Sequence, residues 1–303
     1  MREMKYQESQ LRKFAHPPKE YEVAQIKATE TAIRFALSKY FQKTGLALGQ
    51  NSYEVFLQGS YKNKTNIARG SDVDLVVAYK EQFAYDIGQL TEAERKAFKE
   101  RYGAPKVKLK AFKGYVHRAL VGEFGEQQVD LQNKCIKLRA HKGYCEADIV
   151  PVVTHRTYYC FQPQAADGYK EGIELEAADG SLVRNYPKQH GKLVKAKSGA
   201  THGRFTQVVR IYKGIKEDVL KKGNMHKGQI NSFYLENLLY NVPDGCFEGS
   251  EVEGFYATLE HLSRDFQKRR MGTYCFATGG SLFNKRAWKV EDLGHLLRLM
   301  DGV

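Results

Sequence analysis

Hydrophobic residues near the N-terminus recur with the period of a helix. The spacing is close to 3.6 residues at four positions, Ile26, Ile33, Leu37 and Phe41. This pattern predicts one long helix over residues 18–44, which Gly45 ends. Two apolar runs follow at 53–58 and 72–79 and predict strands. We expect the long helix to form a spine under the sheet that these strands begin.

The middle of the chain carries helix and strand signals in turn. Thr91 and Glu94, in the run TEAE, form a capping-box pattern at the start of one helix, and another helix is predicted over about 105–121. Three short segments then predict an antiparallel continuation of the sheet: QQVDLQ, KCIKLRA and YCEADIVPVV. Residues 155–200 are rich in Gly, Asp, Lys and Tyr, and we expect them to be irregular and to form a lid over the functional site.

The C-terminal third of the chain has helical periodicity and no convincing strand. Helices are predicted at 202–222, 229–241, 252–270 and 290–301. The expected fold is therefore α/β (α+β), with a mixed-sheet catalytic lobe over residues 1–200 and a helical lobe over 201–303. A cleft between the two lobes is the natural place for a ligand.

Two carboxylates lie together on the second predicted strand. Asp72 and Asp74, in the run SDVDLVV, are two positions apart and so share one face of the strand. Like charges held this close repel unless a cation lies between them, and hard carboxylate oxygens suit Mg²⁺. Gly59 and Ser60 precede them, in a turn whose backbone N–H groups and hydroxyl can hold phosphate. The sequence therefore predicts a metal site beside a phosphate site.

A third carboxylate, Asp148, lies in the apolar run ADIVPVV, with Glu146 two residues before it. A lone D-x-D pair in a strand can also be a solvated sheet edge, but the Gly-Ser pair upstream and Asp148 downstream make that reading much weaker. The combined pattern resembles the DNA polymerase β-like nucleotidyltransferases. That resemblance implies that Asp72, Asp74 and Asp148 are the catalytic metal ligands and that Mg²⁺, or Mn²⁺ in its place, is the cofactor.

The composition argues against several other classes of protein. The chain has 303 residues, 42% of them hydrophobic, which is enough for a sizeable core. No apolar run approaches 18 residues and the first residues are too charged for a secretory signal, so we expect a cytoplasmic protein that does not bind membranes. Its five cysteines are odd in number and widely spaced, which favours neither disulfides nor zinc. The net charge of +13 indicates an anionic partner, either nucleotides or nucleic acid.

The resemblance narrows to the CD-NTases, bacterial relatives of cyclic GMP-AMP synthase and the oligoadenylate synthases. It runs over most of the chain and rests on five segments: QGSYKNKTNI…SDVDLVV, ADIVPVV, NYPKQH, FTQVVRIYKGIK and SFYLENLLY. The family pattern implies that Gly59 and Ser60 hold a triphosphate. It also implies that Lys213, or otherwise Lys216, reaches the phosphates from the helical lobe, where an exposed lysine on an amphipathic helix is the ordinary alternative.

The same resemblance assigns three further nucleotide contacts. Ser232 would add a hydroxyl contact, and Phe233 or Tyr234 would stack on a base, unless both rings pack the core of the helical lobe. Asn185, in the segment RNYPKQH, follows Asp148 at the distance where the family places its lid over the acceptor base. An Asn there looks like the mark of synthases that accept pyrimidines, although Asn also commonly shapes turns.

The implied reaction joins nucleoside triphosphates, ATP and UTP among them, into a cyclic di- or oligonucleotide. We expect a monomer that needs no nucleic-acid template and whose product activates a separate effector protein during phage defence. An RNA-terminal nucleotidyltransferase of the poly(A) or CCA-adding kind is the alternative, with the positive charge as an RNA track. A catalytically dead fold that binds nucleic acid is a third reading, which the presence of all three carboxylates disfavours.

Overall fold

The computed structural model describes residues 6–43, 52–67, 72–102, 109–162, 168–226, 228–283 and 288–301. The chain divides into two compact units. The sheet unit consists of Glu20–Gln58 and Asp72–Lys188, and the helical unit consists of Met1–Lys19, Gly59–Ser71 and Gln189–Val303.

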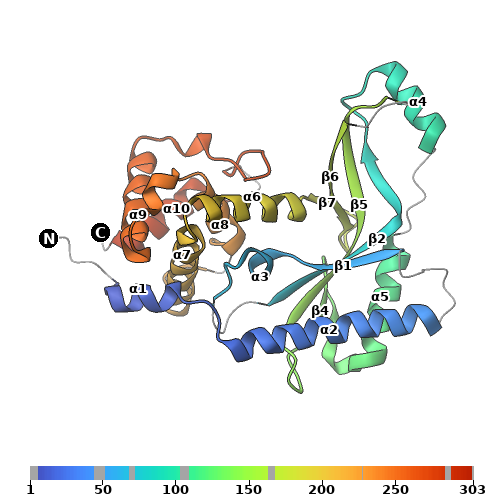
Figure 1. Ribbon diagram of the computed structural model, residues 1–303, viewed down its shortest axis with the longest axis horizontal. Coiled ribbons are helices and arrows are strands. Elements are labelled where there is room, and N and C mark those ends of the chain that lie inside the picture. The colour runs from blue at the N-terminus through green and yellow to red at the C-terminus, as the bar shows by residue number, and fades with distance from the viewer. Residues whose placement is uncertain are drawn as a thin grey trace. The chain divides into compact units, whose positions relative to one another are not determined.

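The described part of the sheet unit is built on a seven-stranded mixed sheet (Figure 1). Its strands are β1 (Tyr53–Leu57), β2 (Val73–Asp86), β3 (Val129–Leu131), β4 (Ile136–Leu138), β5 (Ala147–Cys160), β6 (Gly168–Glu176) and β7 (Leu182–Asn185). Strand β5 is central and runs parallel to β2, while its other edge pairs antiparallel first with β4 and then with β6. The order is β1-β2-β5-β4-β3 at one end, and β6 and β7 extend the sheet from β5.

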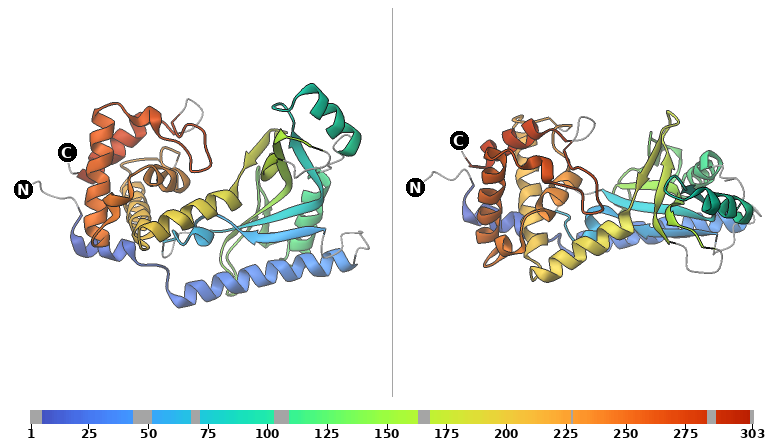
Figure 2. Two further views of the ribbon diagram at one scale, coloured as in Figure 1. Left: turned by 45° about the horizontal axis from the view of Figure 1, so that its top comes forward. Right: turned by 90° about the horizontal axis from the view of Figure 1, so that it is seen from above.

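Helices cover one face of this sheet. The long α2 (Glu20–Lys43) runs beneath the strands in Figure 2, next to α5 (Leu109–Phe124). The ring of Phe112 stacks 6.4 Å from that of Phe41 and lies 5.1 Å from that of Tyr79. The predicted spine helix is confirmed. Gly45, and residues 105–108 of the helix predicted over about 105–121, lie outside the described residues. The opposite face of the sheet stays available for the carboxylates.

The predicted strands and the capping box are confirmed, but β2 and β5 are longer than expected. Helix α4 (Glu92–Tyr102) begins where Thr91 N donates to Glu94 Oε2 at 2.8 Å, and a short 3₁₀ helix (Glu126–Gln128) precedes β3. Strand β2 continues to Asp86, well beyond the predicted end at residue 79. The far ends of these strands pack around the buried ring of Phe98 in α4.

The prediction that residues 155–200 are irregular is wrong. Among its described residues this region completes β5, forms β6 and β7, and then forms α6 (Pro187–Ala200). Many charged and polar residues mask the strands, because β7 lies at the edge of the sheet and is largely exposed, while β6, which pairs with both β5 and β7, is half-buried over much of its length. Their backbone groups are satisfied by pairing with β5 and with each other, so no apolar run is needed.

The helical unit matches the predicted helices closely. Its elements are α1 (Glu8–Ala15), α3 (Gly59–Asn63), most of α6, α7 (Arg204–Lys221), α8 (Ser232–Tyr240), α9 (Glu251–Gln267) and α10 (Val290–Asp301), with 3₁₀ helices at Asp244–Phe247 and Met271–Thr273. In its described residues, strand pairing beyond position 201 is limited to isolated bridges such as Cys275 with Ser281. No described helix of the chain has the length and apolarity that crossing a membrane requires.

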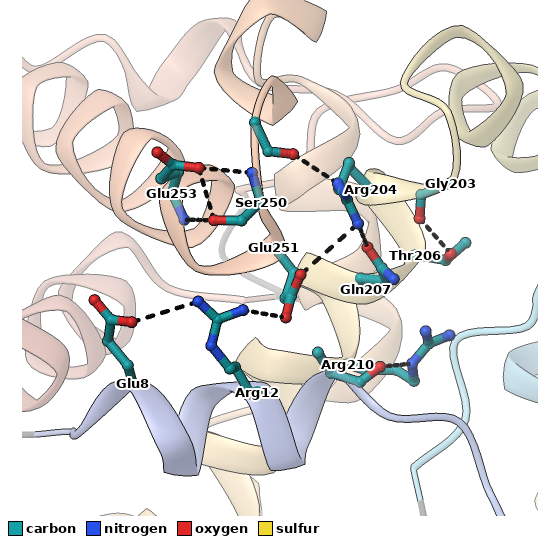
Figure 3. Close-up of polar contacts among 12 residues, drawn as sticks. Glu8, Arg12, Gly203, Arg204, Thr206, Gln207, Arg210, Ser250, Glu251 and Glu253 are labelled. Carbon is teal, nitrogen blue, oxygen red and sulfur yellow. Dashed lines mark hydrogen bonds and ion pairs between the residues drawn. The ribbon is translucent and has the colours of Figure 1, made fainter.

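Helix α7 is the centre of the helical core. Its Phe205, Tyr212 and Ile215 are fully buried, and α1 packs tightly against it. A Cβ on Gly214 would lie 2.4 Å from the ring of Phe14, so this close approach requires glycine. Around α1 and α9, Arg12 Nη1 donates to Glu251 Oε1 at 3.1 Å and a Ser250–Glu253 capping box begins α9 (Figure 3).

A buried carboxylate, that of Glu236 in α8, ties together the segments of the helical unit. Glu236 Oε1 accepts from Asn63 Nδ2 at 2.6 Å and lies 2.7 Å from His190 Nε2. Its Oε2 accepts from the hydroxyl of Thr65 and lies 3.7 Å from Lys213 Nζ. Lys213 Nζ also donates to the backbone oxygen of Thr65 at 3.1 Å. One carboxylate therefore joins α6, α7, α8 and the segment that follows α3.

Arg210 holds the same segment from a second side. Its guanidinium donates to Lys64 O at 2.7 Å and to Ala15 O at 2.6 Å. Burial lowers the pKa of Arg210 to about 10. Lys64 has a φ of +57°, a left-handed conformation that costs energy for a residue with a side chain and that the surrounding contacts must stabilise. The segment after α3 is thus fixed by charged groups from the helices.

The pKa of Glu236 lies below its ordinary value. Burial disfavours the ionised carboxylate, but the hydrogen bond with His190 and the charge of Lys213 outweigh burial. A depressed pKa means that ionised Glu236 contributes stability at neutral pH, and that this stability is lost as the pH falls through the folded-state pKa.

We predict that Glu236→Gln lowers the free energy of unfolding at pH 7 by about 3 kcal/mol or more, because it leaves the buried ammonium of Lys213 without its carboxylate. Denaturant unfolding of both proteins measures the difference. The difference should shrink as the pH falls below about 4, because the unfolded-state carboxyl then becomes protonated and the folded-state carboxyl follows at a lower pH.

Glu260→Gln is the matched control. The side chain of Glu260 is 73% exposed and pairs with Arg264 on the same helix, so its loss should change stability by less than about 0.5 kcal/mol. Equal effects of the two substitutions would contradict a special role for the Glu236 carboxylate.

Candidate active site

The pairing of β2 with β5 brings two of the predicted carboxylates together. Asp74 is the second residue of β2, and its register partner on the parallel strand β5 is Asp148. Neighbouring strands lie about 4.8 Å apart, so these carboxylates are adjacent on one face of the sheet. Asp72 lies directly before β2, and Gln58 N at the end of β1 donates to Asp74 O at 2.9 Å. The three aspartates are thus gathered at one end of β2 and β5.

Lys137 belongs to this cluster, although sequence reasoning did not identify it. It is the register partner of Asp148 on β4, at the other edge of β5. Its Nζ lies 3.4 Å from Asp72 Oδ2 and forms a salt bridge with Glu146 Oε1. The hydrogen bond to Glu146 and the nearby aspartates raise the pKa of Lys137. The segment KCIKLRA predicts a strand, but only its register shows that this lysine faces the carboxylates.

The carboxylates repel one another. Burial and the charge of Glu146 raise the pKa of Asp72 above its ordinary value, and Lys137 offsets only part of this. Burial and the charge of Asp148 raise the pKa of the Cys135 thiol to about 12. Asp148 Oδ1 is buried and has no hydrogen-bond partner among the described residues. A concentration of negative charge of this kind favours binding of a cation.

The donor set fits a hard divalent metal ion. Asp72, Asp74 and Asp148 supply only carboxylate oxygens, which Mg²⁺ and Mn²⁺ prefer, and Asp148 Oδ1 is a buried acceptor that needs a partner. These side chains do not surround one point as they stand: among the described residues, no three His, Cys, Asp or Glu groups form a finished metal-binding cluster. Lys137 lies between Asp72 and Glu146 in this arrangement.

Gly59 and Ser60 lie at the start of α3 rather than in an open turn. The chain passes from β1 through Gln58 into Gly59, whose φ of +66° requires the freedom of glycine. Ser60 O then accepts from Thr65 N at 2.9 Å. Because Thr65 is held by Glu236, the Gly59–Ser60 segment is attached to the helical unit.

The two candidate phosphate-binding lysines have different surroundings. Lys213 is 4% exposed and holds Thr65 and Glu236. One turn later on α7, Lys216 Nζ donates to Ser232 Oγ at 2.8 Å and pairs with Glu217. The structure therefore brings Ser232 together with Lys216, while Lys213 belongs to the buried network.

The two candidate stacking residues differ in exposure. Phe233 is 47% exposed at the start of α8, and its ring stacks 5.7 Å from that of Phe276. The ring of Tyr234 is half-buried and packs against Trp288 at 5.6 Å. Asn231 caps the helix by accepting from Phe233 N at 2.8 Å. Of the two rings, Phe233 offers the more accessible face.

Asn185 is the last residue of β7 and is exposed. Its partner on β6 is Ile173, which in turn belongs to the apolar cluster that also contains Val76 and Val150. Val76 and Val150 lie two residues beyond Asp74 and Asp148 on their strands, so they share the face of the carboxylates. Asn185 therefore lies on the sheet that carries the three aspartates, several strands away from them.

Known proteins match the chain in both its sequence and its fold. Residues 192–301 match the C-terminal helical domain of cGAS/DncV-like nucleotidyltransferases. The cyclic UMP-AMP synthase of Rhodothermus marinus is 32% identical over 300 residues, which are 97% of this chain and 96% of that protein. The cyclic nucleotide synthase CdnE01 of Staphylococcus haemolyticus is 36% identical over 200 residues, 65% of this chain and 66% of the relative.

A solved structure agrees with these relationships. The structure of the Rhodothermus marinus c-UMP-AMP synthase CdnE with Apcpp and Upnpp superposes with a TM-score of 0.80 at 31% identity, covering 98% of this chain and 95% of the other. The polymerase β-like fold and the nucleotidyltransferase class expected from the motifs are thereby confirmed. This chain belongs to the CD-NTase family of cyclic nucleotide synthases.

Proposed function

We propose that this enzyme joins nucleoside triphosphates into a cyclic di- or oligonucleotide that contains uridine and serves as a second messenger in antiphage defence. The observation that carries the proposal is the register of β2 and β5, which sets Asp74 beside Asp148 with Asp72 next to them. Three carboxylates in this position suit transfer of a nucleotidyl group to a hydroxyl. The relatives, named as cyclic nucleotide synthases, support a ring-shaped product.

Asp72, Asp74 and Asp148 are the residues that would hold Mg²⁺ or Mn²⁺. When bound, the metal lowers the pKa of the attacking ribose hydroxyl and neutralises charge on the triphosphate. Asp148, the register partner of Asp74, would accept a hydrogen bond from that hydroxyl. The hydroxyl oxygen attacks the α-phosphorus in line, the bond to the bridging oxygen breaks, and pyrophosphate leaves. A second transfer closes the ring.

Residues of the helical unit would bind the donor nucleotide. Gly59 and Ser60 offer a backbone N–H and a hydroxyl to the triphosphate. Ser232 would add a hydroxyl. Its Oγ accepts a hydrogen bond from Lys216 Nζ at 2.8 Å, which supports Lys216 as the lysine that contacts phosphate, while Lys213 holds Thr65 in the segment that follows α3. The exposed ring of Phe233 would stack on a base, a contact worth about 1–3 kcal/mol.

We predict that Asp72→Asn, Asp74→Asn and Asp148→Asn each lower product formation about a hundredfold or more, because each removes a carboxylate that cannot be replaced by a neighbour. Turnover of radiolabelled NTPs measures the effect. Asp130→Asn, which breaks an exposed pair with Arg139 on the same sheet, should leave activity within about twofold. A doubly substituted Asp72/Asp74 protein that kept more than a small fraction of wild-type turnover would refute the assignment.

Thermal unfolding in EDTA checks that the loss of activity is not a loss of fold. The pKa of Asp72 is raised, so its ionised form opposes folding at neutral pH. Asp72→Asn should therefore unfold at the same or a higher temperature at pH 7. Any gain should disappear below about pH 4, where the wild-type carboxyl is protonated in both states.

We predict that Asn185 favours a pyrimidine. An exposed amide offers one donor and one acceptor to a base edge, so radiolabelled UTP should enter the product. Asn185→Ser should shift incorporation toward ATP, while Asn224→Ser, at an exposed position of the helical unit, should not. A purine-only product from the wild-type enzyme supplied with all four NTPs would disprove the uridine assignment.

We predict that synthesis needs no nucleic acid. The +13 charge is spread along the chain, and the reaction as proposed uses one nucleotide as the acceptor for another, without a primer. Nuclease-treated enzyme given NTPs and Mg²⁺ should form product at the untreated rate. If product returned only when RNA or DNA was added back, the template-free proposal would fail and the RNA-terminal alternative would gain support.

A further inference from the structure

A lysine ammonium group lies among the carboxylates that would bind the metal. Asp148 on β5 is the register partner of both Asp74 on β2 and Lys137 on β4, so the three side chains follow one another across the sheet on one face. From β4 the lysine reaches back to Asp72, where its Nζ lies 3.4 Å from Oδ2. All four residues belong to the sheet unit.

Glu146 is the second partner of this lysine. It stands two residues before Asp148, and its backbone oxygen accepts from Val73 N at 3.0 Å, which keeps it beside Asp72. Its Oε1 forms a salt bridge with Lys137 Nζ. The ammonium group is therefore shared between a proposed metal ligand, Asp72, and a carboxylate with no role in metal binding so far.

The lysine and a metal ion would compete for Asp72. Mg²⁺ bound to the same carboxylate oxygen at about 2.1 Å would lie within about 6 Å of the ammonium group. At that distance a divalent and a monovalent cation repel each other, and a half-buried site screens the repulsion less than bulk water does. The presence of Lys137 beside Asp72 also agrees with the finding that no finished metal cluster is formed by the described residues.

The same geometry gives the lysine another place to stay. The side chains of Asp72 and Glu146 are 44% and 39% exposed, so neither ion pair is locked in the interior. A lysine carries its charge on a flexible stem, and Lys137 can leave Asp72 while its salt bridge with Glu146 persists. Release of Asp72 therefore does not leave the ammonium group without a counter-ion.

We propose that Lys137 is the counter-ion of the metal-free enzyme, which holds Asp72 and competes with the divalent metal ion, and that Glu146 keeps the lysine when the metal binds. Lys137 is thus a positioning residue that sets the metal concentration at which the aspartates become occupied. This inference rests on the proposed function, which assigns the metal to Asp72, Asp74 and Asp148.

Metal binding without nucleotide tests the competition directly. Mn²⁺ is titrated into the nucleotide-free protein, and electron paramagnetic resonance measures the free ion. Lys137→Gln should lower the Kd for Mn²⁺ about tenfold or more, because a competing cation is removed. Lys137→Arg, which keeps the charge, should not bind Mn²⁺ more tightly than the wild type. Lys134→Gln, the same change in charge at an exposed position between β3 and β4, should leave the Kd within about twofold.

Glu146→Gln should act in the opposite direction. It leaves Lys137 to Asp72 alone, so the Kd for Mn²⁺ should rise. In the Lys137→Gln protein the same Glu146→Gln change should have a much smaller effect, because Glu146 acts through the lysine. A direct metal ligand would show the same loss in both proteins, and that result would contradict the role given to Glu146.

Thermal unfolding supplies a second readout that does not depend on catalysis. In EDTA, Lys137→Gln should unfold at a lower temperature than the wild type, because Asp72 and Glu146 lose their shared cation. At Mn²⁺ concentrations well above both Kd values this deficit should vanish or change sign, because the metal supplies positive charge and binds the variant more tightly. A lysine that only stabilised the fold would give the same deficit in both conditions.

The inference and the proposed function fail by different results. An unchanged or raised Kd in Lys137→Gln, an equal decrease in Lys134→Gln, or an equal thermal deficit with and without Mn²⁺ would overturn the competition while leaving the synthase function intact. Absence of any product from the wild-type enzyme supplied with NTPs and Mg²⁺ would instead refute the proposed function.

Discussion

The buried carboxylate of Glu236 is the constraint on which the helical unit depends. It holds Asn63 and Thr65, a few residues after the Gly59–Ser60 pair, and it lies one turn after Ser232 on α8. A single ionised group therefore fixes both phosphate-binding candidates of this unit in one framework. A buried charge is costly unless fully paired, and here hydroxyl, amide, imidazole and ammonium groups surround it. We infer that the network gives the unit a defined geometry more than a large net stability.

The sheet unit, in contrast, holds several negative charges close together. Parallel pairing of β2 and β5 sets Asp74 against Asp148, and backbone hydrogen bonds supply this register. Lys137, on β4 at the other side of β5, forms ion pairs with Asp72 and Glu146 and so offsets part of the repulsion. Burial and the charge of Glu146 still raise the pKa of Asp72 in the presence of Lys137, so the compensation is incomplete. Incomplete compensation is what a site that binds a cation requires.

The sequence predicted the carboxylates well and their surroundings poorly. Asp72, Asp74 and Asp148 stand in apolar strands where an ionised residue needs a reason, so local pattern is enough to find them. The local pattern does not identify Lys137, because its position beside the carboxylates depends on strand register. Lys213 and Lys216 are three residues apart on one helix, and only tertiary packing decides that the first is buried and the second meets Ser232. Strands β6 and β7 do not stand out in the sequence because their few apolar residues, such as Ile173 and Leu175, stand among charged ones, although strand pairing satisfies their backbone groups.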